Sequence, residues 1–179
     1  LLTLLVANEK NNKDLAIHHF MQGEFLLNQG NYALAVLEFQ DALDIDPNAA
    51  TIHISIADGY RRLGRSKHAE NHLEIAISLD SNDISAREML GQLYLLNRQY
   101  KLAENQFLAL SKIDVNNDNY LSILGDLAKL QKEWNKSIDF YLKAYQINPQ
   151  NFKVLENAMQ VCLSVELFKK AEQICKMLV

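Results

Sequence analysis

The stretch GEFLLNQGNYALAVLEFQDALDIDPN, residues 23–48, decides the fold because its pattern returns at intervals of 34 residues. Pro47 and Pro149 lie three such intervals apart, and stepping by 34 elsewhere aligns further columns without any insertion. One column of small residues holds Gly23, Ala57, Gly91 and Gly125 and then ends at Met159. A regular internal period of this length indicates an array of similar structural units.

Two further columns explain why the period exists. The second small column holds Ala35, Ala69, Ala103, Ser137 and Ala171. A column of large, mostly apolar residues holds Phe39, Leu73, Phe107, Tyr141 and Cys175. Antiparallel helices pack closely where small side chains let their backbones approach and large apolar side chains fill the remaining space. The columns therefore predict a pair of packed helices in every repeat.

Apolar residues spaced three and four apart predict the positions of these helices. The first helix of each pair is expected near residues 15–28, 50–63, 84–97, 118–131 and 152–165. The second is expected near residues 32–45, 66–79, 100–113, 134–147 and 168–179. Only 6 Gly and 2 Pro interrupt the chain, which favours long helices over a sheet with many turns. Asp and Asn in the short links are suited to capping the next helix.

The pattern of Gly23, Tyr32, Ala35, Phe39, Ala42 and Pro47 resembles the tetratricopeptide repeat in residue type and spacing. This resemblance implies an all-α fold, a right-handed superhelical solenoid of antiparallel helix pairs forming one continuous domain. The repeats would be residues 16–49, 50–83, 84–117, 118–151 and a truncated 152–179. Residues 1–15 fit the second helix and link of a preceding partial repeat, so we expect a slice of a longer array.

Composition and motifs exclude several function classes. The net charge is −4 and no basic run occurs, so nucleic acid is not an expected partner. No segment approaches the roughly 20 apolar residues of a membrane helix, so we expect no membrane insertion by this segment. A Gly-rich phosphate loop, a GxSxG motif and a convincing carboxylate pair are missing, so neither an enzyme nor a cofactor is expected. A cytoplasmic location is favoured, while a periplasmic or membrane-anchored parent stays open.

The histidines and cysteines are interpreted as structural. His68 and His72 share one face of an expected helix, but zinc sites need three or four protein ligands, so we expect an exposed convex face and no metal. His19 occupies a packing column and is expected to be a partly buried filler. Cys162 and Cys175 replace apolar residues in facing columns, which favours buried reduced thiols and leaves a disulfide open.

The resemblance also implies that the first helices line a concave surface with binding side chains at fixed slots. These slots hold Glu24, Asn28, Asp58, Arg61, Arg62, Glu88, Gln92, Leu95, Asp126, Lys129, Glu156, Gln160 and Leu163. Pairing within one helix, of Asp58 with Arg61 or Arg62 and of Asp126 with Lys129, is an equal alternative to partner binding. Three other carboxylates, Glu24, Glu88 and Glu156, show no such obvious cation partner within their own helices, which predicts a mildly acidic groove.

Together these expectations predict that the chain is a protein–protein interaction scaffold. It would bind a peptide or partner helix of basic or polar character. Two alternatives remain open. The chain could be the interaction or regulatory arm of an enzyme whose catalytic domain lies outside these residues. It could instead be a self-assembling structural array, a homo-oligomer joined through uncapped ends.

Overall fold

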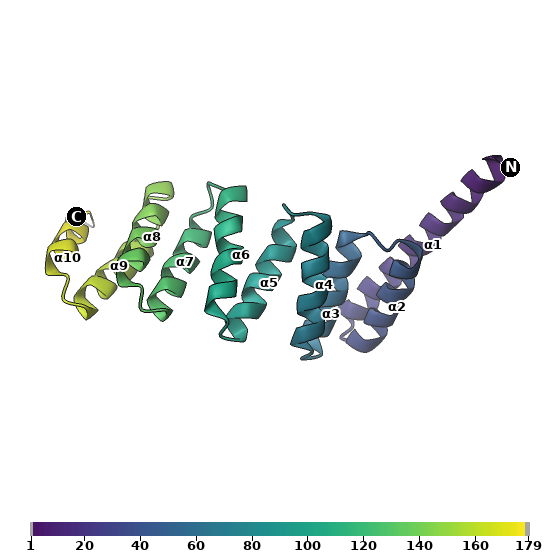
Figure 1. The fold of residues 1–179 in the computed structure, drawn as a ribbon, viewed down its shortest axis with the longest axis horizontal. Coiled ribbons are helices and arrows are strands. Elements are labelled where there is room, and N and C mark those ends of the chain that lie inside the picture. Colours follow the sequence, from purple (N-terminus) through teal and green to yellow (C-terminus); the bar gives the residue numbers. More distant parts are fainter. Residues whose placement is uncertain (1, 178–179) are drawn as a thin grey trace. The chain divides into compact units, whose positions relative to one another are not determined.

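The protein is entirely helical over the range that its structure describes. The structure is a computed structural model that describes the backbone of residues 2–177 and the side chains of residues 12–177. Over the described backbone no strand occurs, and ten helices follow one another along the chain; they carry the same labels in Figure 1. They are α1 (Leu2–Asn28), α2 (Tyr32–Ile45), α3 (Ala50–Arg62), α4 (Ser66–Leu79), α5 (Ile84–Leu96), α6 (Tyr100–Ile113), α7 (Asp118–Leu130), α8 (Trp134–Ile147), α9 (Phe152–Ser164) and α10 (Phe168–Cys175). The prediction of an all-α fold is confirmed.

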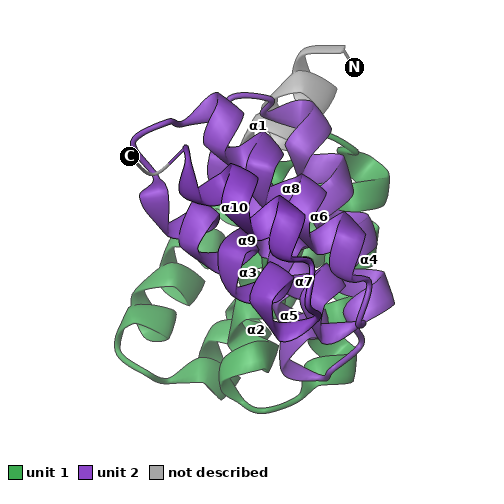
Figure 2. Cartoon of the chain, turned by 90° about the vertical axis from the view of Figure 1, so that its left-hand side faces the viewer, with its two compact units in different colours: residues 1–90 green, residues 91–179 purple. Residues whose placement is uncertain are grey.

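The helices form two compact units, residues 1–90 and residues 91–179, with the division inside α5 (Figure 2). In the first unit α1 packs on α2, α3 packs on α4, and α2 also contacts α3. In the second unit α7 packs on α8 and α9 on α10, while α6 contacts α7 and α8 contacts α9. Each unit is thus a stack in which helices contact their neighbours in sequence, as in helical repeat proteins. Among the described residues, no helix is both long and apolar enough to span a bilayer.

In several helix pairs, a glycine of the first helix packs directly against an aromatic ring of the second helix. A Cβ atom at Gly23 would lie 2.5 Å from the ring of Phe39, and one at Gly125 would lie 2.5 Å from the ring of Tyr141. Both rings are fully buried. Any side chain larger than hydrogen would therefore collide with the ring, which explains why these two columns pair small with large residues.

The turn after each first helix uses one backbone conformation at the same position of every repeat. The φ angle is positive at Gly30, Gly64, Arg98, Lys132 and Glu166, between 58° and 80°. The residue after each of them donates its N–H to the carbonyl five residues earlier, as in the bond of 2.9 Å from Asn31 to Leu26. This is the Schellman end of a helix, which glycine adopts freely and other residues adopt at a cost of roughly 1–2 kcal/mol.

Helix α1 differs from the expectation. It runs from Leu2 to Asn28 without interruption, where a separate helix and link were expected over residues 1–15. Residues 9–15 contain neither glycine nor proline, so no residue there forces the helix to end. The last helix, α10, ends at Cys175 rather than continuing to 179, and residues 178–179 lie outside the described part. The limits of the individual repeats remain a proposal.

A buried carboxylate joins α6 to α8, which the sequence patterns did not predict. Glu104 is 2% exposed and accepts hydrogen bonds from Lys101 (2.9 Å), Lys136 and Gln131 (3.3 Å). Burial by itself raises the pKa of Glu104, but these hydrogen bonds outweigh it and lower the pKa below its ordinary value. The same column holds Val36, Glu70, Ile138 and Glu172, so a glutamate at this position gave no distinctive signal in the sequence.

Candidate protein-interaction face

On the first unit, the expected contact positions of α1 are partly engaged within the protein. The carboxylate of Glu24 is half-buried and accepts a hydrogen bond of 2.7 Å from the hydroxyl of Ser55 on α3. Asn28 is exposed at the last residue of α1, and Glu88 on α5 is half-buried. Glu24 thus has a partner that the sequence did not predict, a neutral hydroxyl on the neighbouring first helix rather than a cation on its own helix.

Asp58 on α3 binds two arginines of its own helix. Its Oδ1 contacts Arg61, and its Oδ2 lies 2.8 Å from Nε of Arg62. Burial raises the pKa of Asp58, but the hydrogen bonds from Arg62 and Arg61 outweigh it and hold the pKa below its ordinary value. The guanidinium of Arg62 also lies over the ring of Tyr32, 5.5 Å from its centre. Pairing within the helix is confirmed, and this group presents two cations for one anion.

On the second unit, Asp126 of α7 has partners on two helices. Its Oδ1 accepts a hydrogen bond of 2.6 Å from the hydroxyl of Tyr141 on α8 and lies 3.3 Å from Nζ of Lys129. Burial and the neighbouring Asp126 together raise the pKa of Tyr141. The side chain of Asp126 is still 49% exposed. The predicted pairing of Asp126 with Lys129 is confirmed, and the carboxylate stays accessible from outside.

Helix α9 presents its expected contact residues to solvent. Glu156 and Gln160 are exposed, and the Glu156 carboxylate lies 3.3 Å from Nζ of Lys153. The expectation that Glu156 has no partner is therefore wrong, although both side chains of this pair are more than half exposed. On α5, Gln92 is exposed and Leu95 is half-buried.

A histidine cluster lies between α3 and α4 in the first unit. The Nδ1 atoms of His53 and His72 are 3.0 Å apart, and Nε2 of His53 is 3.4 Å from the carbonyl oxygen of Pro47. The ring of Tyr60 lies against His68 and His72, with ring centres 5.0 and 5.7 Å apart. His68 is exposed, as expected, but the expectation of an exposed convex face is wrong for His72, which is half-buried against His53.

We expect this cluster to make the stability of the folded chain depend on pH. Burial, and then the charges of His53 and His68, lower the pKa of His72 from 6.5 to about 4. Between these two values the unfolded chain binds a proton at His72 more readily than the folded chain does, so stability falls as the pH falls from 6.5 to 4. We expect His72→Gln to flatten this part of the dependence, as measured by thermal unfolding at a series of pH values. The exposed His18→Gln is the control, and equal slopes in both variants would contradict the prediction.

The environments of the two cysteines and of His19 agree only in part with those predicted from the sequence. Both cysteines are free; Cys162 is buried as expected, whereas Cys175 is exposed, so the expectation of a buried thiol is wrong there. His19 is half-buried, as a filler would be, but its Nδ1 also lies 2.8 Å from the carboxylate of Glu38 on α2. This contact was not predicted, because the two residues are 19 positions apart and belong to different helices.

The comparison with protein families agrees with the column pattern. The family model described as tetratricopeptide repeat matches residues 4–50 and 54–118. The chain belongs to the tetratricopeptide repeat family.

Solved structures of other tetratricopeptide repeat proteins share this fold. A crystal structure of MamA protein is 18% identical, with a TM-score of 0.78, and the alignment covers 92% of this chain and 90% of MamA. The structure of YrrB, described as a tetratricopeptide repeat protein with an unusual peptide-binding site, is 20% identical, with a TM-score of 0.74. That alignment covers 97% of this chain and 89% of YrrB. At these identities the likeness establishes the fold of this tetratricopeptide repeat chain.

One curated relative is an enzyme by name. Protein O-mannosyl-transferase F38B6.6 of Caenorhabditis elegans is 29% identical over 75 residues. These residues are 42% of this tetratricopeptide repeat chain but only 11% of the relative's length.

Proposed function

We propose that this chain is a non-catalytic scaffold that binds a peptide or a partner helix in a groove lined by the first helices α7 and α9 of its second unit. The observation that carries the proposal is the exposed face of α9, where Glu156, Gln160 and Leu163 follow one another at spacings of four and three residues. Side chains at these spacings lie on one face of a helix. Leu163 is 53% exposed, so this face offers an apolar contact beside an amide and a carboxylate.

Helix α7 also combines a carboxylate with an exposed apolar side chain. Asp126 and the 54% exposed Leu130 are four residues apart and therefore share a face, with Lys129 beside them. A partner with basic and apolar side chains would match these two helices. On α3, Arg61 and Arg62 carry two positive charges beside the single negative charge of Asp58. We therefore assign the preference for basic partners to α7 and α9. A largely preformed face of this kind binds an extended segment with little ordering of its own.

The proposal predicts that removing two carboxylates weakens the binding of a cationic peptide. The double variant Asp126→Asn and Glu156→Gln should raise the dissociation constant several-fold, because each exposed ion pair contributes about 0.2–1 kcal/mol. The dependence of affinity on salt should also decrease. Fluorescence anisotropy with labelled basic, polar and acidic peptides of equal length measures both effects. Asn at position 126 keeps an oxygen that can accept the hydrogen bond of Tyr141.

The matched control changes the same charges on the second helices of the same unit. Asp139 on α8 and Glu172 on α10 are exposed, so Asp139→Asn with Glu172→Gln alters the net charge equally. The control should bind the basic peptide as the parent does. An equal loss in both double variants would show a general charge effect, and no binding of any peptide class would refute the proposed scaffold role.

A second candidate function follows from the curated relative. As a segment of a larger glycosyl-transferring enzyme, the chain would act as an interaction or regulatory arm, with the chemistry located in the remainder of that protein. The 29% identity over 75 residues to a protein O-mannosyl-transferase favours this candidate. The sequence of the parent gene distinguishes the two, since a transferase domain in the same reading frame is required by the second and not by the first.

A further inference from the structure

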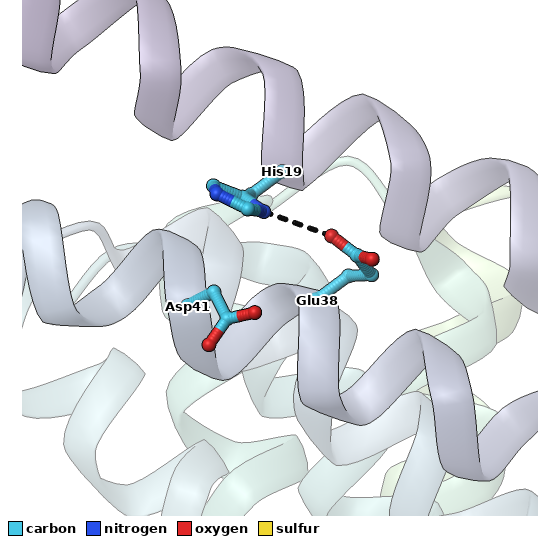
Figure 3. Close-up of side chains that lie close together, drawn as sticks. All are labelled: His19, Glu38 and Asp41. Carbon is cyan, nitrogen blue, oxygen red and sulfur yellow. Dashed lines mark hydrogen bonds and ion pairs between the residues drawn. The ribbon is translucent and has the colours of Figure 1, made fainter.

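We infer that His19 of α1 and Glu38 and Asp41 of α2 form a binding site for a divalent transition metal such as Zn²⁺. Figure 3 shows His19 reaching from its helix toward the two carboxylates on the neighbouring helix. Nδ1 of His19 lies 2.8 Å from Oε2 of Glu38, and one ligand atom from each of the three residues lies within 4.8 Å of the others. His19 and Glu38 are half-buried, and Asp41 is exposed.

The distances suit a shared ion with little movement of the helices. Zinc lies about 2.0–2.1 Å from histidine nitrogen and about 2.0–2.2 Å from carboxylate oxygen, so two ligand atoms of a tetrahedral site are about 3.3–3.5 Å apart. The 2.8 Å between Nδ1 of His19 and Oε2 of Glu38 is slightly shorter, so a small rotation of these side chains would make room for the ion. Asp41 lies three residues after Glu38 and therefore on the same face of α2. Its side chain is exposed, so it can turn toward the ion.

The donor set selects the class of metal. One imidazole and two carboxylates suit Zn²⁺ and the neighbouring first-row ions, since imidazole binds these metals well. Ca²⁺ and Mg²⁺ favour sites made of oxygen ligands alone, so the histidine disfavours them. Three protein ligands are the number found in open zinc sites, in which water or another molecule occupies the fourth position.

The other repeats show that packing alone does not require these residues. At the positions equivalent to His19 and Glu38, the fourth repeat has Leu121 and Phe140. The second repeat has His53 and His72 there, but Ile75 replaces the third ligand. An apolar pair thus serves the helix contact in another repeat, whereas the first repeat combines three metal-binding side chains. The set is therefore a property of the first repeat rather than of the fold.

A metal at this position would tie α1 to α2 and stabilise the folded chain. Isothermal titration calorimetry with ZnCl₂ tests the site on the full chain, freed of any affinity tag and carrying Cys175→Ser so that the exposed thiol does not bind zinc. One ion per chain should bind. Asp41→Asn and, separately, His19→Gln should each weaken binding about tenfold or more. Absorption of Co²⁺ in the visible range reports the same coordination independently of stability.

Two controls separate this site from other zinc ligands. Asp44→Asn makes the same charge change at an exposed position about one helical turn further along α2. His72→Gln breaks the contact between His53 and His72. Both should bind zinc as the parent does. No measurable heat with the parent, an equal loss with Asp44→Asn, or loss of binding only with His72→Gln would overturn the inference.

Thermal unfolding provides a second readout that does not depend on heats of binding. At a hundredfold excess of zinc over the dissociation constant, the unfolding temperature of the parent should rise by about 5–10 °C. Asp41→Asn should show little rise, and because Asp41 is exposed, its circular dichroism spectrum should match that of the parent. A rise of the same size in Asp41→Asn would contradict the assigned ligand set.

Discussion

Replacing Phe39 by alanine is expected to lower the free energy of unfolding by about 3–5 kcal/mol, as for other fully buried aromatic residues. The Phe39 side chain is 0% exposed, and its ring fills the space above Gly23 and packs against Phe20, with ring centres 5.7 Å apart. Glycine has no side chain that could move into the cavity, so the site cannot readily collapse. Urea denaturation followed by circular dichroism measures the loss.

Phe25→Ala is the matched control for this prediction. It removes the same ring from the same unit, but Phe25 is 57% exposed. Substitutions at such positions usually change stability by less than about 0.5 kcal/mol. Similar losses in the two variants would show that the contact with Gly23 does not determine the stability of the first helix pair.

Gly125→Ala is expected to destabilise the protein by about 2 kcal/mol, the range found for overpacked cores. In an exposed helix interior the same change would stabilise by about 1 kcal/mol, because alanine is the better helix former. Here the added Cβ would lie 2.5 Å from a ring carbon of Tyr141. That ring is fully buried, and its hydroxyl is bound to Asp126, so it has little freedom to move away.

A double-mutant cycle tests whether this collision is the cause. In a Tyr141→Leu background the ring is absent, so adding Gly125→Ala should cost nothing further and could stabilise the helix. The interaction energy between positions 125 and 141 is read from the free energies of unfolding of the four proteins. Additive losses would contradict the proposed contact, whereas strong coupling would support it.

The order and limits of the helices were predictable because they depend on spacing along the chain. Helices α2, α4, α6 and α8 begin and end at the residues that the 34-residue columns predict. Ion pairs within a single helix were predictable for the same reason, since Asp58 with Arg62 and Asp126 with Lys129 are four and three residues apart.

Contacts between helices were much less predictable. Glu24 with Ser55 and Glu104 with Lys136 join residues 31 and 32 positions apart, and such contacts depend on side-chain conformations that no column records. The continuity of α1 was missed because the period predicted a link where no residue breaks the helix. The partner-binding slots depend on a ligand as well as on the chain, so the sequence predicts their positions but not what they hold.

The left-handed turn that follows every first helix has a consequence for how such a chain can change in length. Inserting a single residue into a helix rotates everything beyond it by about 100° about the helix axis, which would move the glycine away from its aromatic partner. Adding a complete 34-residue segment leaves every later turn, from Gly30 to Glu166, in the same phase. Duplication or deletion of whole repeats is therefore the change in length that this architecture tolerates, whereas single-residue insertions within its helices would be eliminated by selection.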